Sequence, residues 1–387
     1  MFEIVDKDPG ATIIKVIGVG GAGGNAVEHM IREGVQGVDF ICANTDGQAL
    51  KKSSAGVKLQ FGPGLGAGGK PEKAREHALA ERDKIAEALS GAHMVFITAG
   101  MGGGTGTGAA PIVAEVAREL GILTVAVVTK PFEYEGKRMS LAEKGLAELA
   151  LHVDSLIVIL NEKLMEVLGD EVSMLEAFRS ADNVLKNAVG GIAEIINVPG
   201  LVNVDFEDVR TVMGEMGKAM MGSATAAGVD RARIAAEQAV ASPLLEGIEL
   251  SGARGVLVNI TASPSLGMRE VKEVMNTIRN YAAHDATIIF GTVFEDGMED
   301  QLRVTVVATG LGAAAKVQAK PTISVVSGLR TGTDDRIIDD GSSGLDGGLP
   351  AVFQSGRAGA RNAAVDAMTA SGVDKYDIPA FLRKQAD

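Results

Sequence analysis

The stretch Gly102-Gly103-Gly104-Thr105-Gly106-Thr107-Gly108 decides the fold of this chain. It follows the apolar run at residues 93–99 and precedes a helical pattern at residues 106–120. Ordering glycine costs conformational entropy, so such a density of glycine is typical of a backbone that closely approaches a ligand. The threonine hydroxyls and the positive end of the following helix favour an anion such as phosphate. A flexible surface loop is the alternative interpretation.

A second glycine-rich stretch lies upstream, again between an apolar run and a helical pattern. Its members are Gly20, Gly21, Ala22, Gly23, Gly24 and Asn25. Together with Gly18 it matches the G-x-G-x-x-G pattern of dinucleotide-binding domains, in which an acidic residue ends the next strand. Here Asn44 stands at the end of that strand and Asp46 follows two positions later, which weakens the match. An NAD-dependent oxidoreductase nevertheless remains an alternative at this point. Two anion-binding stretches in one domain favour a single ligand with several phosphates.

A third glycine-rich stretch, from Gly64 to Lys70, fits the G-x-x-x-x-G-K pattern of P-loop proteins. A working P-loop needs Ser or Thr at the next position, because that hydroxyl binds Mg²⁺. Pro71 occupies this position, which excludes a P-loop. The glycines and Lys70 can nevertheless line a phosphate pocket.

The composition is that of an ordinary globular protein, with 387 residues, 46% hydrophobic and 22% charged. The net charge of −13 argues against binding to the phosphate backbone of nucleic acids, which requires a basic surface. The single cysteine, Cys42, excludes an internal disulfide and a cysteine-based metal site, and its apolar neighbours predict burial. No apolar run approaches the roughly 18 residues of a membrane span, and the N-terminus lacks a signal-peptide pattern. We therefore expect a cytoplasmic protein.

Short apolar runs alternate with helical patterns between residues 11 and 173, after an N-terminal tail at residues 1–10. This alternation predicts an α/β fold with a Rossmann-type parallel sheet covered by helices on both faces. Strands are expected at 12–19, 38–43, 93–98, 123–129 and 155–160, and helices at 25–33, 71–89, 106–120 and 138–151. Ligands of such sheets bind at the carboxyl ends of the strands, where both of the first two glycine-rich stretches lie.

A long central helix is expected within residues 174–199, and a second, smaller α/β domain at 200–312. In that domain we expect strands at 255–261, 287–293 and 303–308, and helices at 230–241 and 268–283. Residues 313–373 are rich in Gly, Ser, Ala and Asp without a sustained period, which predicts a disordered linker. Residues 374–387 place apolar side chains between charges, which favours a partner-binding tail peptide over a terminal helix packed on the body.

Three motifs in this order resemble the tubulin/FtsZ family of GTPases. They are the stretches at 20–26 and 102–108 and the acidic segment Asn203-Val204-Asp205-Phe206-Glu207-Asp208. The resemblance covers residues 11–312 and returns at 374–387. It implies a tubulin/FtsZ-like fold and GTP-dependent, head-to-tail assembly into protofilaments of the bacterial division ring. GTP would be hydrolysed at the contact between subunits.

The resemblance also implies which residues bind GTP. The phosphates would be held by Gly20, Gly21, Ala22, Gly23, Gly24 and Asn25 and by Gly102, Gly103, Gly104, Thr105, Gly106 and Thr107. Glu135 and Arg138 would approach the ribose and phosphates, and Asn44 would add a further contact. Asn161 would bond the base or sugar.

Phe178 and Asp182 lie four residues apart on one face of the long helix. By the resemblance, Phe178 would stack on guanine, and the Asp182 carboxylate would accept from its N1–H and exocyclic amine. A core phenylalanine beside a solvated aspartate is the alternative. For Arg138, an exposed charge at a helix start is the alternative.

The acidic segment carries the residues that the resemblance identifies as catalytic. Asp205 and Asp208 would polarise the attacking water in the pocket of the next subunit, and Asn203 would help to position it. Taken alone, the segment also fits a helix N-cap at Asp205 or a cation site, although it offers few ligands for calcium.

The resemblance further implies Mg²⁺ with the GTP and a tail peptide that binds the membrane tethers FtsA and ZipA at mid-cell. The chain departs from the family pattern at residues 62–71, where the loop is shorter and Lys70 replaces the commoner asparagine. A nonhydrolysing filament scaffold is therefore a second alternative. The paired carboxylates Asp205 and Asp208 argue against it, because a scaffold does not need them at an interface.

Overall fold

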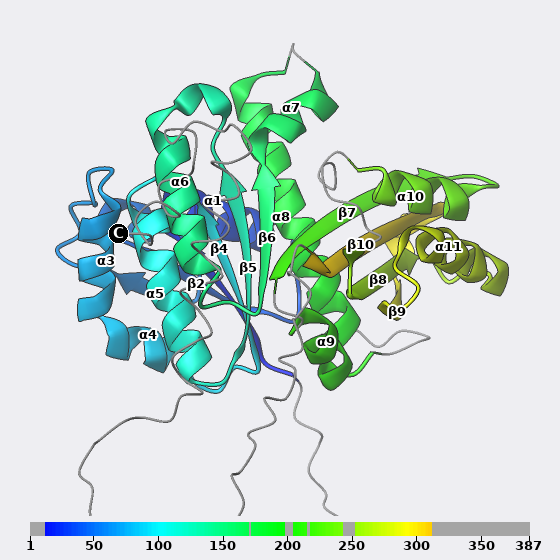
Figure 1. Ribbon diagram of the computed structural model, residues 1–387, viewed down its shortest axis with the longest axis horizontal. Helices are drawn as coiled ribbons and strands as arrows, with labels where there is room; N and C mark the ends of the chain where they lie inside the picture. Colours follow the sequence, from blue (N-terminus) through cyan, green and yellow to red (C-terminus); the bar gives the residue numbers. More distant parts are fainter. Residues whose placement is uncertain (1–11, 170–171, 198–203, 215–216, 243–251, 312–387) are drawn as a thin grey trace, which may run out of the picture. The chain divides into compact units, whose positions relative to one another are not determined.

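The computed structural model describes residues 12–169, 172–197, 204–214, 217–242 and 252–311 (Figure 1). Several features expected from the sequence lie outside these residues. They are the N-terminal tail at 1–10, the end of the expected central helix at 198–199, Asn203, the linker at 313–373 and the tail peptide at 374–387.

A ten-stranded sheet runs through the described chain in the order β3-β2-β1-β4-β5-β6-β7-β10-β8-β9. Its first six strands are all parallel, as the alternation of strand and helix predicts. They are β1 (Ile14–Val19), β2 (Asp39–Asn44), β3 (Val57–Gln60), β4 (Met94–Gly100), β5 (Leu123–Lys130) and β6 (Ser155–Leu160).

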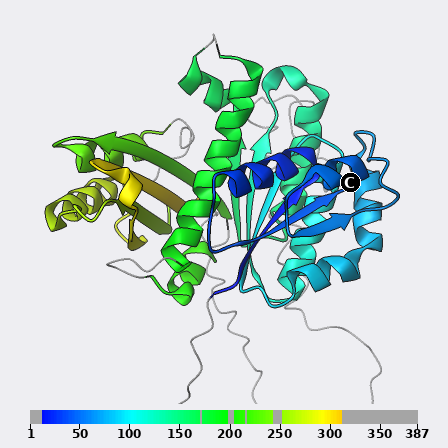
Figure 2. The ribbon, with the colours of Figure 1, turned by 180° about the vertical axis from the view of Figure 1, so that it is seen from behind.

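Helices cover both faces of this parallel part. They are α1 (Gly20–Arg32), α2 (Gly47–Lys52), α3 (Pro71–Ala80), α4 (Arg82–Leu89), α5 (Thr105–Glu119), α6 (Lys137–Leu149), α7 (Asn161–Leu168) and α8 (Met174–Asn197), with a 3₁₀ turn at Glu133–Glu135. Figure 1 is seen from the side of α3 to α6, and Figure 2 from the side of α1. Alternate side chains of β1 point to opposite faces of the sheet. Ile14 and Val16 pack with α1 and α8, whereas Ile17 and Val19 pack with α3 to α6.

The remaining part of the sheet is mixed. Its elements are α9 (Phe206–Met213), β7 (Gly217–Ala227), α10 (Arg231–Val240), β8 (Gly255–Ala262), α11 (Met268–Tyr281), β9 (Thr287–Phe294), a 3₁₀ turn (Asp296–Met298) and β10 (Gln301–Leu311). β10 pairs antiparallel with β7 and β8, and β9 pairs parallel with β8. β7 joins the first part through a short parallel pairing with β6. A separate apolar cluster lies under α10 and α11.

Some sequence expectations about these elements are wrong. The helix expected at residues 71–89 is two helices, because Glu81 leaves helical geometry (φ −108°, ψ 21°) where both halves pack on α5. The first glycine-rich stretch is not a loop before a helix, since α1 begins at Gly20 rather than at Asn25. Five further elements were not expected from the sequence, namely β3, β7, α2, α7 and α9. β7 is built largely of Gly, Ala and Ser, which have little strand preference of their own.

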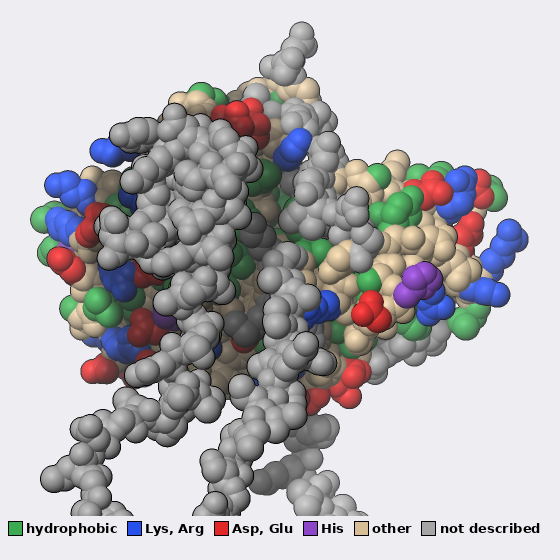
Figure 3. Space-filling view, in the orientation of Figure 1, with side chains coloured by type: hydrophobic (Ala, Val, Ile, Leu, Met, Phe, Trp, Pro, Cys, Tyr) green, Lys and Arg blue, Asp and Glu red, His purple; other side chains and the backbone are tan. Residues whose placement is uncertain are grey.

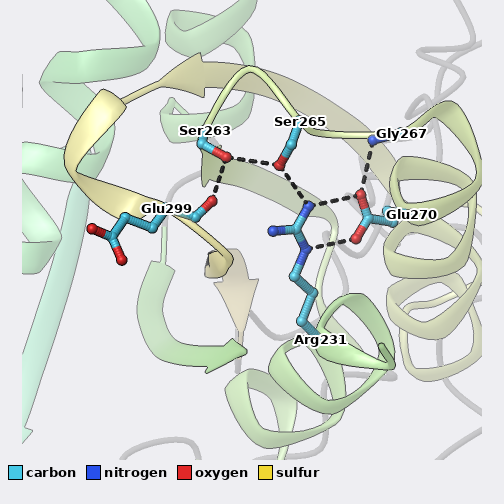
Figure 4. A network of polar contacts seen from close by, with 6 residues as sticks. All are labelled: Arg231, Ser263, Ser265, Gly267, Glu270 and Glu299. Atoms are coloured by element: carbon cyan, nitrogen blue, oxygen red, sulfur yellow. Dashed lines mark hydrogen bonds and ion pairs between the residues drawn. The ribbon is translucent and has the colours of Figure 1, made fainter. Parts of the chain in front are cut away.

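A buried ion pair organises the region around α10 and α11 (Figure 4). Arg231 is only 6% exposed, and its Nε and Nη2 donate to the two carboxylate oxygens of Glu270 at 2.7 and 3.1 Å. Nη2 also lies 3.2 Å from Ser265 Oγ, and the hydroxyls of Ser265 and Ser263 are 2.8 Å apart. Ser263 Oγ donates to the carbonyl of Glu299 at 2.5 Å. The network therefore connects the start of α10, the start of α11 and the turn before β10.

The surface of the described residues carries charges of both signs. Figure 3 shows acidic and basic side chains interspersed on the face drawn, not gathered into a basic patch. Several are paired, as Arg82 is with Glu115 and Glu119 on α5. None of the described helices is long and apolar enough to cross a lipid bilayer.

Candidate active site

The first two glycine-rich stretches meet at the carboxyl ends of β1 and β4. Gly20 follows β1 and has a positive φ of 79°. A Cβ added to Gly20 would lie 2.9 Å from the backbone nitrogen of Gly106. A Cβ on Gly100 would similarly lie 2.6 Å from the Ala22 Cβ. Gly20 requires glycine for its conformation and for its approach to Gly106, and Gly100 requires glycine for its approach to Ala22.

Gly21 differs from Gly20 although the two are neighbours in α1. No atom of the described residues lies within 4 Å of the position that a Cβ of Gly21 would occupy. The N-terminus of α1 is thus open to the outside at this point, and its first turn has no acidic residue. An open, positively polarised helix start is a suitable place for phosphate oxygens.

Two further loops join the site. The hydroxyls of Thr45, which follows β2, and Thr105 lie 2.6 Å apart, and the Gly66 N–H donates to the Thr45 carbonyl at 2.8 Å. A Cβ on Gly104 would lie 3.0 Å from the Ala67 Cβ. The segment from Gly64 to Lys70 therefore packs directly on the stretch at 102–108. Thr45 was not expected at this place, although its position at the end of β2 was a signal.

Thr107 has a structural task. It is 3% exposed, and its Oγ1 accepts a hydrogen bond from the Gly102 N–H at 2.8 Å. Gly102 has a φ of 91°, and a Cβ there would lie 2.7 Å from the Arg138 carbonyl. The bond from Thr107 thus holds the tight turn that brings this stretch against the start of α6.

Glu135 and Arg138 form a pair beside that turn. Arg138 Nη1 donates to Glu135 Oε2 at 2.7 Å, and Glu135 Oε1 accepts from the Phe132 N–H at 3.2 Å. The Arg138 side chain is 66% exposed, whereas that of Glu135 is 19% exposed. The guanidinium lies at the rim of the site with its charge balanced by Glu135.

Asn161 carries an unsatisfied polar atom. It is the first residue of α7 and is 7% exposed, yet no group of the described residues donates to its buried Oδ1. A buried acceptor of this kind costs free energy unless another group donates to it. A ligand with N–H or O–H groups at the end of β6 would supply that donor.

Phe178 and Asp182 project from the first half of α8. Phe178 is 46% exposed, and its ring lies edge-to-face with that of Phe132 at a centroid distance of 6.2 Å. Burial raises the pKa of Asp182 to about 6, against the opposing effect of the positive charges of His29 and Arg32 on α1. An exposed aromatic face and a half-buried carboxyl group one helical turn away suit a planar base with N–H donors.

A pocket lies beside the start of α1. It is lined by Gly20, Gly21, Gly24, Asn25, Glu28, Cys42, Asn44, Ala49, Lys52 and Ser53. Asn44 is 5% exposed at the end of β2, where the sequence analysis placed it. Cys42 is 3% exposed, which confirms its buried position, and burial raises the pKa of its thiol. The sequence did not indicate the remaining lining residues, because the packing of α1 and α2 brings them to the pocket. They are Glu28, Ala49, Lys52 and Ser53.

The acidic segment lies at the opposite ends of the strands. Asp205 is the N-cap of α9, and its Oδ1 accepts from the Asp208 N–H at 2.8 Å, so the N-cap interpretation is confirmed. The Phe206 ring lies 6.0 Å from that of His93, just before β4 begins, and Ser155 at the start of β6 donates to the carbonyl of Met213. These contacts put α9 at the amino ends of β4 and β6. A strand such as β4, with seven residues, separates its two ends by about 20 Å.

The fold and site therefore define a class of α/β protein that binds a phosphorylated ligand at the carboxyl ends of its strands and carries an acidic loop at the other ends. Comparison with known proteins gives the family. Residues 13–169 match the model of the tubulin/FtsZ family GTPase domain, and residues 217–312 match that of the FtsZ family C-terminal domain.

Full-length relatives and solved structures agree. The cell division protein FtsZ of Pseudomonas aeruginosa is 53% identical over 394 residues, and all of both chains is covered. That of Coxiella burnetii is 52% identical over 389 residues, with 99% of each chain covered. An FtsZ dimer of M. jannaschii superposes with a TM-score of 0.74 at 43% identity, covering 77% of this chain and 88% of that one. A GTPγS-bound CetZ2 protofilament of Haloferax volcanii, at 20% identity and a TM-score of 0.67 over 79% of this chain and 95% of that one, shares the fold.

This chain belongs to the tubulin/FtsZ family. It binds guanine nucleotide, is a GTPase, and assembles with itself into GTP-dependent filaments of the bacterial division ring. The expected fold class and activity are confirmed, and the NAD-dependent oxidoreductase that the first glycine-rich stretch permitted is excluded.

Proposed function

We propose that GTP lies across the carboxyl ends of β1, β4 and β6, with its phosphates between the two glycine-rich stretches. Gly20 to Asn25 and Asn44 contact the phosphate region from one side, and Gly102 to Thr107 contact it from the other. The open N-terminus of α1 at Gly21 and the contact between Gly20 and Gly106 support this position. Thr107 supports phosphate binding in two ways. Its hydroxyl holds the turn at Gly102, and the residue lies in the first turn of α5, whose N-terminus faces the phosphates.

The base and sugar extend toward α7 and α8. The unpartnered Oδ1 of Asn161 accepts from the base or ribose, and Phe178 stacks on guanine. Asp182, when ionised, accepts from the N1–H and the exocyclic amine, a pair of donors that adenine does not offer. Glu135 and Arg138 approach the ribose and phosphates from the rim.

Hydrolysis requires the next subunit. Asp205 and Asp208 polarise the attacking water in the neighbouring pocket, and Asn203 helps to position it. The observation that carries this proposal is the placement of α9 at the amino ends of the strands whose carboxyl ends hold the glycines. One chain cannot bring the two sets together, whereas a head-to-tail contact can. Such a contact joins unlike surfaces and therefore propagates into a filament.

These roles divide the chain into domains. Residues 11–173 form the GTP-binding domain, 174–199 the central helix and 200–312 a second α/β domain that carries the acidic loop. The linker at 313–373 connects this body to the tail peptide at 374–387, which binds FtsA and ZipA and holds the filaments at mid-cell. The apolar residues Ile378, Phe381 and Leu382 between charged neighbours support a peptide of this kind.

Mg²⁺ accompanies the nucleotide and neutralises phosphate charge. No group of three or more His, Cys, Asp or Glu side chains within the described residues could hold a metal ion. The residues present fit Mg²⁺ only where phosphate oxygens and water supply most ligands, which is the usual arrangement for this ion at nucleotides. Asp205 and Asp208 are exposed and remain available to the neighbouring site.

The test is hydrolysis by mixtures of two inactive variants. Gly21→Val fills the phosphate side of the pocket, and Asp208→Ala removes a catalytic carboxylate. Random mixing at equal amounts should restore roughly a quarter of the wild-type rate. A site is complete only where an Asp208→Ala subunit supplies the nucleotide pocket and a Gly21→Val subunit supplies the acidic segment, and roughly a quarter of random contacts have this arrangement. No recovery in a mixture whose sedimented filaments contain both variants, or activity per subunit that does not depend on protein concentration, would mean a self-contained site.

A further inference from the structure

Helix α9 carries the acidic segment, and its two ends are held in different ways. At the C-terminal end, the Ser155 hydroxyl donates to the carbonyl of Met213 at 2.6 Å, and the Thr309 hydroxyl donates to that of Val212 at 2.7 Å. Both bonds are buried, so this end of the helix is fixed to β6 and β10. Among the described residues, no hydrogen bond of this kind joins the N-terminal turn of α9, at 205–208, to a strand.

Apolar contacts hold the N-terminal turn instead. Phe206 is the only apolar residue among the first three of the helix, and its partly buried ring packs against the core shared by α1 and α8. On the other side of the cap, Val204 is only 5% exposed. The three carboxylates of the turn are exposed and belong to Asp205, Glu207 and Asp208. Their direction therefore depends on how the two apolar neighbours of Asp205 are anchored.

His93 supplies a ring against which Phe206 packs. It lies just before β4, and the centroids of the two rings are 6.0 Å apart with their planes at 63°. This is the edge-to-face arrangement that aromatic rings favour. Because Phe206 directly follows Asp205, a shift of the Phe206 ring would also move the backbone that carries the Asp205 carboxylate.

The ring of His93 is itself held in one orientation. Its Nδ1 accepts a hydrogen bond from the Ile13 N–H at 3.0 Å. The backbone N–H of His93 donates to the Ile13 carbonyl at 2.9 Å, and the His93 carbonyl accepts from the Leu123 N–H at 3.1 Å. Side chain and backbone of His93 are thus bonded to the amino ends of β1 and β5, which leaves the ring little freedom to turn.

We propose that His93 is a positioning residue for GTP hydrolysis, which aims Asp205 and Asp208 through its contact with Phe206. This role rests on the shared site proposed above. The parallel sheet then serves both halves of that site, because it holds the nucleotide at its carboxyl end and orients the acidic segment at its amino end. A displacement of about 1 Å can cost about a hundredfold in rate, so such a contact affects turnover more than folding.

Two substitutions separate the two contacts of the ring. His93→Asn keeps an acceptor for the Ile13 N–H but removes the ring, whereas His93→Phe keeps a ring against Phe206 and removes the acceptor. The bond from Ile13 is exposed, so water can replace it. His152→Asn is the matched control, since His152 lies before β6 and no ring contact joins it to α9 within the described part of the chain.

Phosphate release above the assembly threshold gives the turnover per subunit, and GTP affinity is measured below that threshold. His93→Asn should lower turnover about tenfold, whereas GTP affinity and the assembly threshold should change less than about twofold. His93→Phe should recover about half of the wild-type turnover or more, and His152→Asn should match the wild type. In a chain that already carries Phe206→Leu, His93→Asn should have little further effect, because the ring contact is already lost.

Mixtures of inactive variants show which subunit needs His93. When Gly21→Val is mixed with Asp208→Ala, the Gly21→Val chain supplies the acidic segment. His93→Asn added to that chain should reduce the recovered turnover about tenfold. The same substitution added to the Asp208→Ala chain should leave the recovery unchanged, because the acidic segment of that chain is already inactive.

Several outcomes would overturn the proposal. Unchanged turnover in His93→Asn would remove the residue from the reaction, and an equal loss from either chain of the mixture would indicate a general effect on the fold. A raised assembly threshold would assign His93 to the contact between subunits. A loss that His93→Phe does not recover would mean that the ring contact is not its cause. If the mixture fails to recover with His93 intact in both chains, the shared site itself is wrong, and this failure is distinct from the others.

Discussion

Asp205 Oδ1 accepts a hydrogen bond from the Asp208 backbone N–H at 2.8 Å, so one proposed catalytic carboxylate also begins helix α9. The bond uses the carboxylate of Asp205 but only the backbone of Asp208. Substitutions can therefore separate the capping role from the catalytic one, because the side chain of Asp208 has no part in the cap.

At Asp205, Asn and Ala should differ in stability but not in turnover. Asn caps a helix as well as Asp does, whereas Ala loses the cap at a cost of about 1 kcal/mol. Both variants lack the negative charge, so both should lose GTP hydrolysis. Urea unfolding and phosphate release, measured on the same samples, check the two effects. Wild-type turnover in Asp205→Asn would limit this residue to capping.

At Asp208, replacement by Asn should abolish most turnover without loss of stability. General acid–base groups contribute about 10²- to 10⁴-fold to rate, so we expect a fall of that order. GTP-dependent light scattering should persist, since the nucleotide and the contact remain. Glu207→Gln, one position earlier on the same exposed turn, is the control and should hydrolyse GTP normally.

Adjacent glycines should respond differently to the same substitution. Gly20→Ala places a methyl group against the Gly106 backbone at a φ of 79°, which should destabilise the fold by more than about 1 kcal/mol. Gly21→Ala meets no atom within 4 Å, so stability should be unchanged or slightly higher. If phosphates approach Gly21, its Ala variant should nevertheless bind GTP at least about tenfold more weakly. Full GTP affinity in Gly21→Ala would place the phosphates elsewhere.

The affinity for GTP should fall in mild acid because of Asp182. Its pKa, raised by burial to about 6, means that the carboxylate is ionised above that pH and protonated below it. Only the ionised form accepts from both guanine donors, so affinity should decrease by up to about tenfold per pH unit below the pKa. Titrations between pH 5 and pH 8 check this, and Asp182→Asn should bind more weakly with a flatter profile. An equally steep profile in Asp182→Asn would assign the dependence to another group.

The same group affects folding with the opposite sign. Because the pKa of Asp182 is higher in the folded state than its ordinary value, protonation favours folding. This contribution to the free energy of unfolding is present in full below the unfolded pKa and is lost as the pH rises through about 6. Guanine binding would lower the pKa again and offset that loss.

Glu270→Gln should be destabilising, because it removes the carboxylate that accepts from the largely buried guanidinium of Arg231 and leaves Asp300 as the remaining negative charge beside it. Removal of one partner from a fully buried pair costs about 3–5 kcal/mol, and the loss here should be smaller because the Glu270 side chain is 22% exposed. Glu207→Gln breaks an exposed pair with Arg210 by the same chemistry and should cost less than about 1 kcal/mol. Denaturant unfolding compares the two. A similar, small loss in both would mean that the network in Figure 4 adds little to stability.

Arg231 also lowers the pKa of Glu270 through their hydrogen bonds. The stabilisation from this carboxylate is therefore present above its unfolded pKa and is lost as the pH falls through the lower, folded value. Acid unfolding of Glu270→Gln should lack this component.

Local patterns in the sequence were sufficient to predict most of the elements. The strand at Ser155–Leu160 and the start of the helix at Met174 were predicted at their observed positions, because a continuous apolar run and a 3.6-residue period are local signals. The break at Glu81 and strand β7 were not predictable in this way. The break has no proline or glycine to mark it, and β7 is held by pairing with β10, which is distant in the sequence.

The sequence by itself predicted the parallel α/β order, because strand and helix periods are properties of short stretches. The motifs at 20–26, 102–108 and 203–208 carried the resemblance that implied the family and the GTPase activity. Only the tertiary structure decided which groups meet. It brought Gly20 to Gly106 and Lys70 to Gly104, left the Oδ1 of Asn161 without a donor, and put Asp205 at the far ends of the strands. The physical reason is that these contacts depend on how β1, β4 and β6 lie side by side in one sheet. Strand direction then separates the glycine-rich stretches from the acidic segment by about the length of a strand, and for this reason we propose that the complete site requires a second subunit.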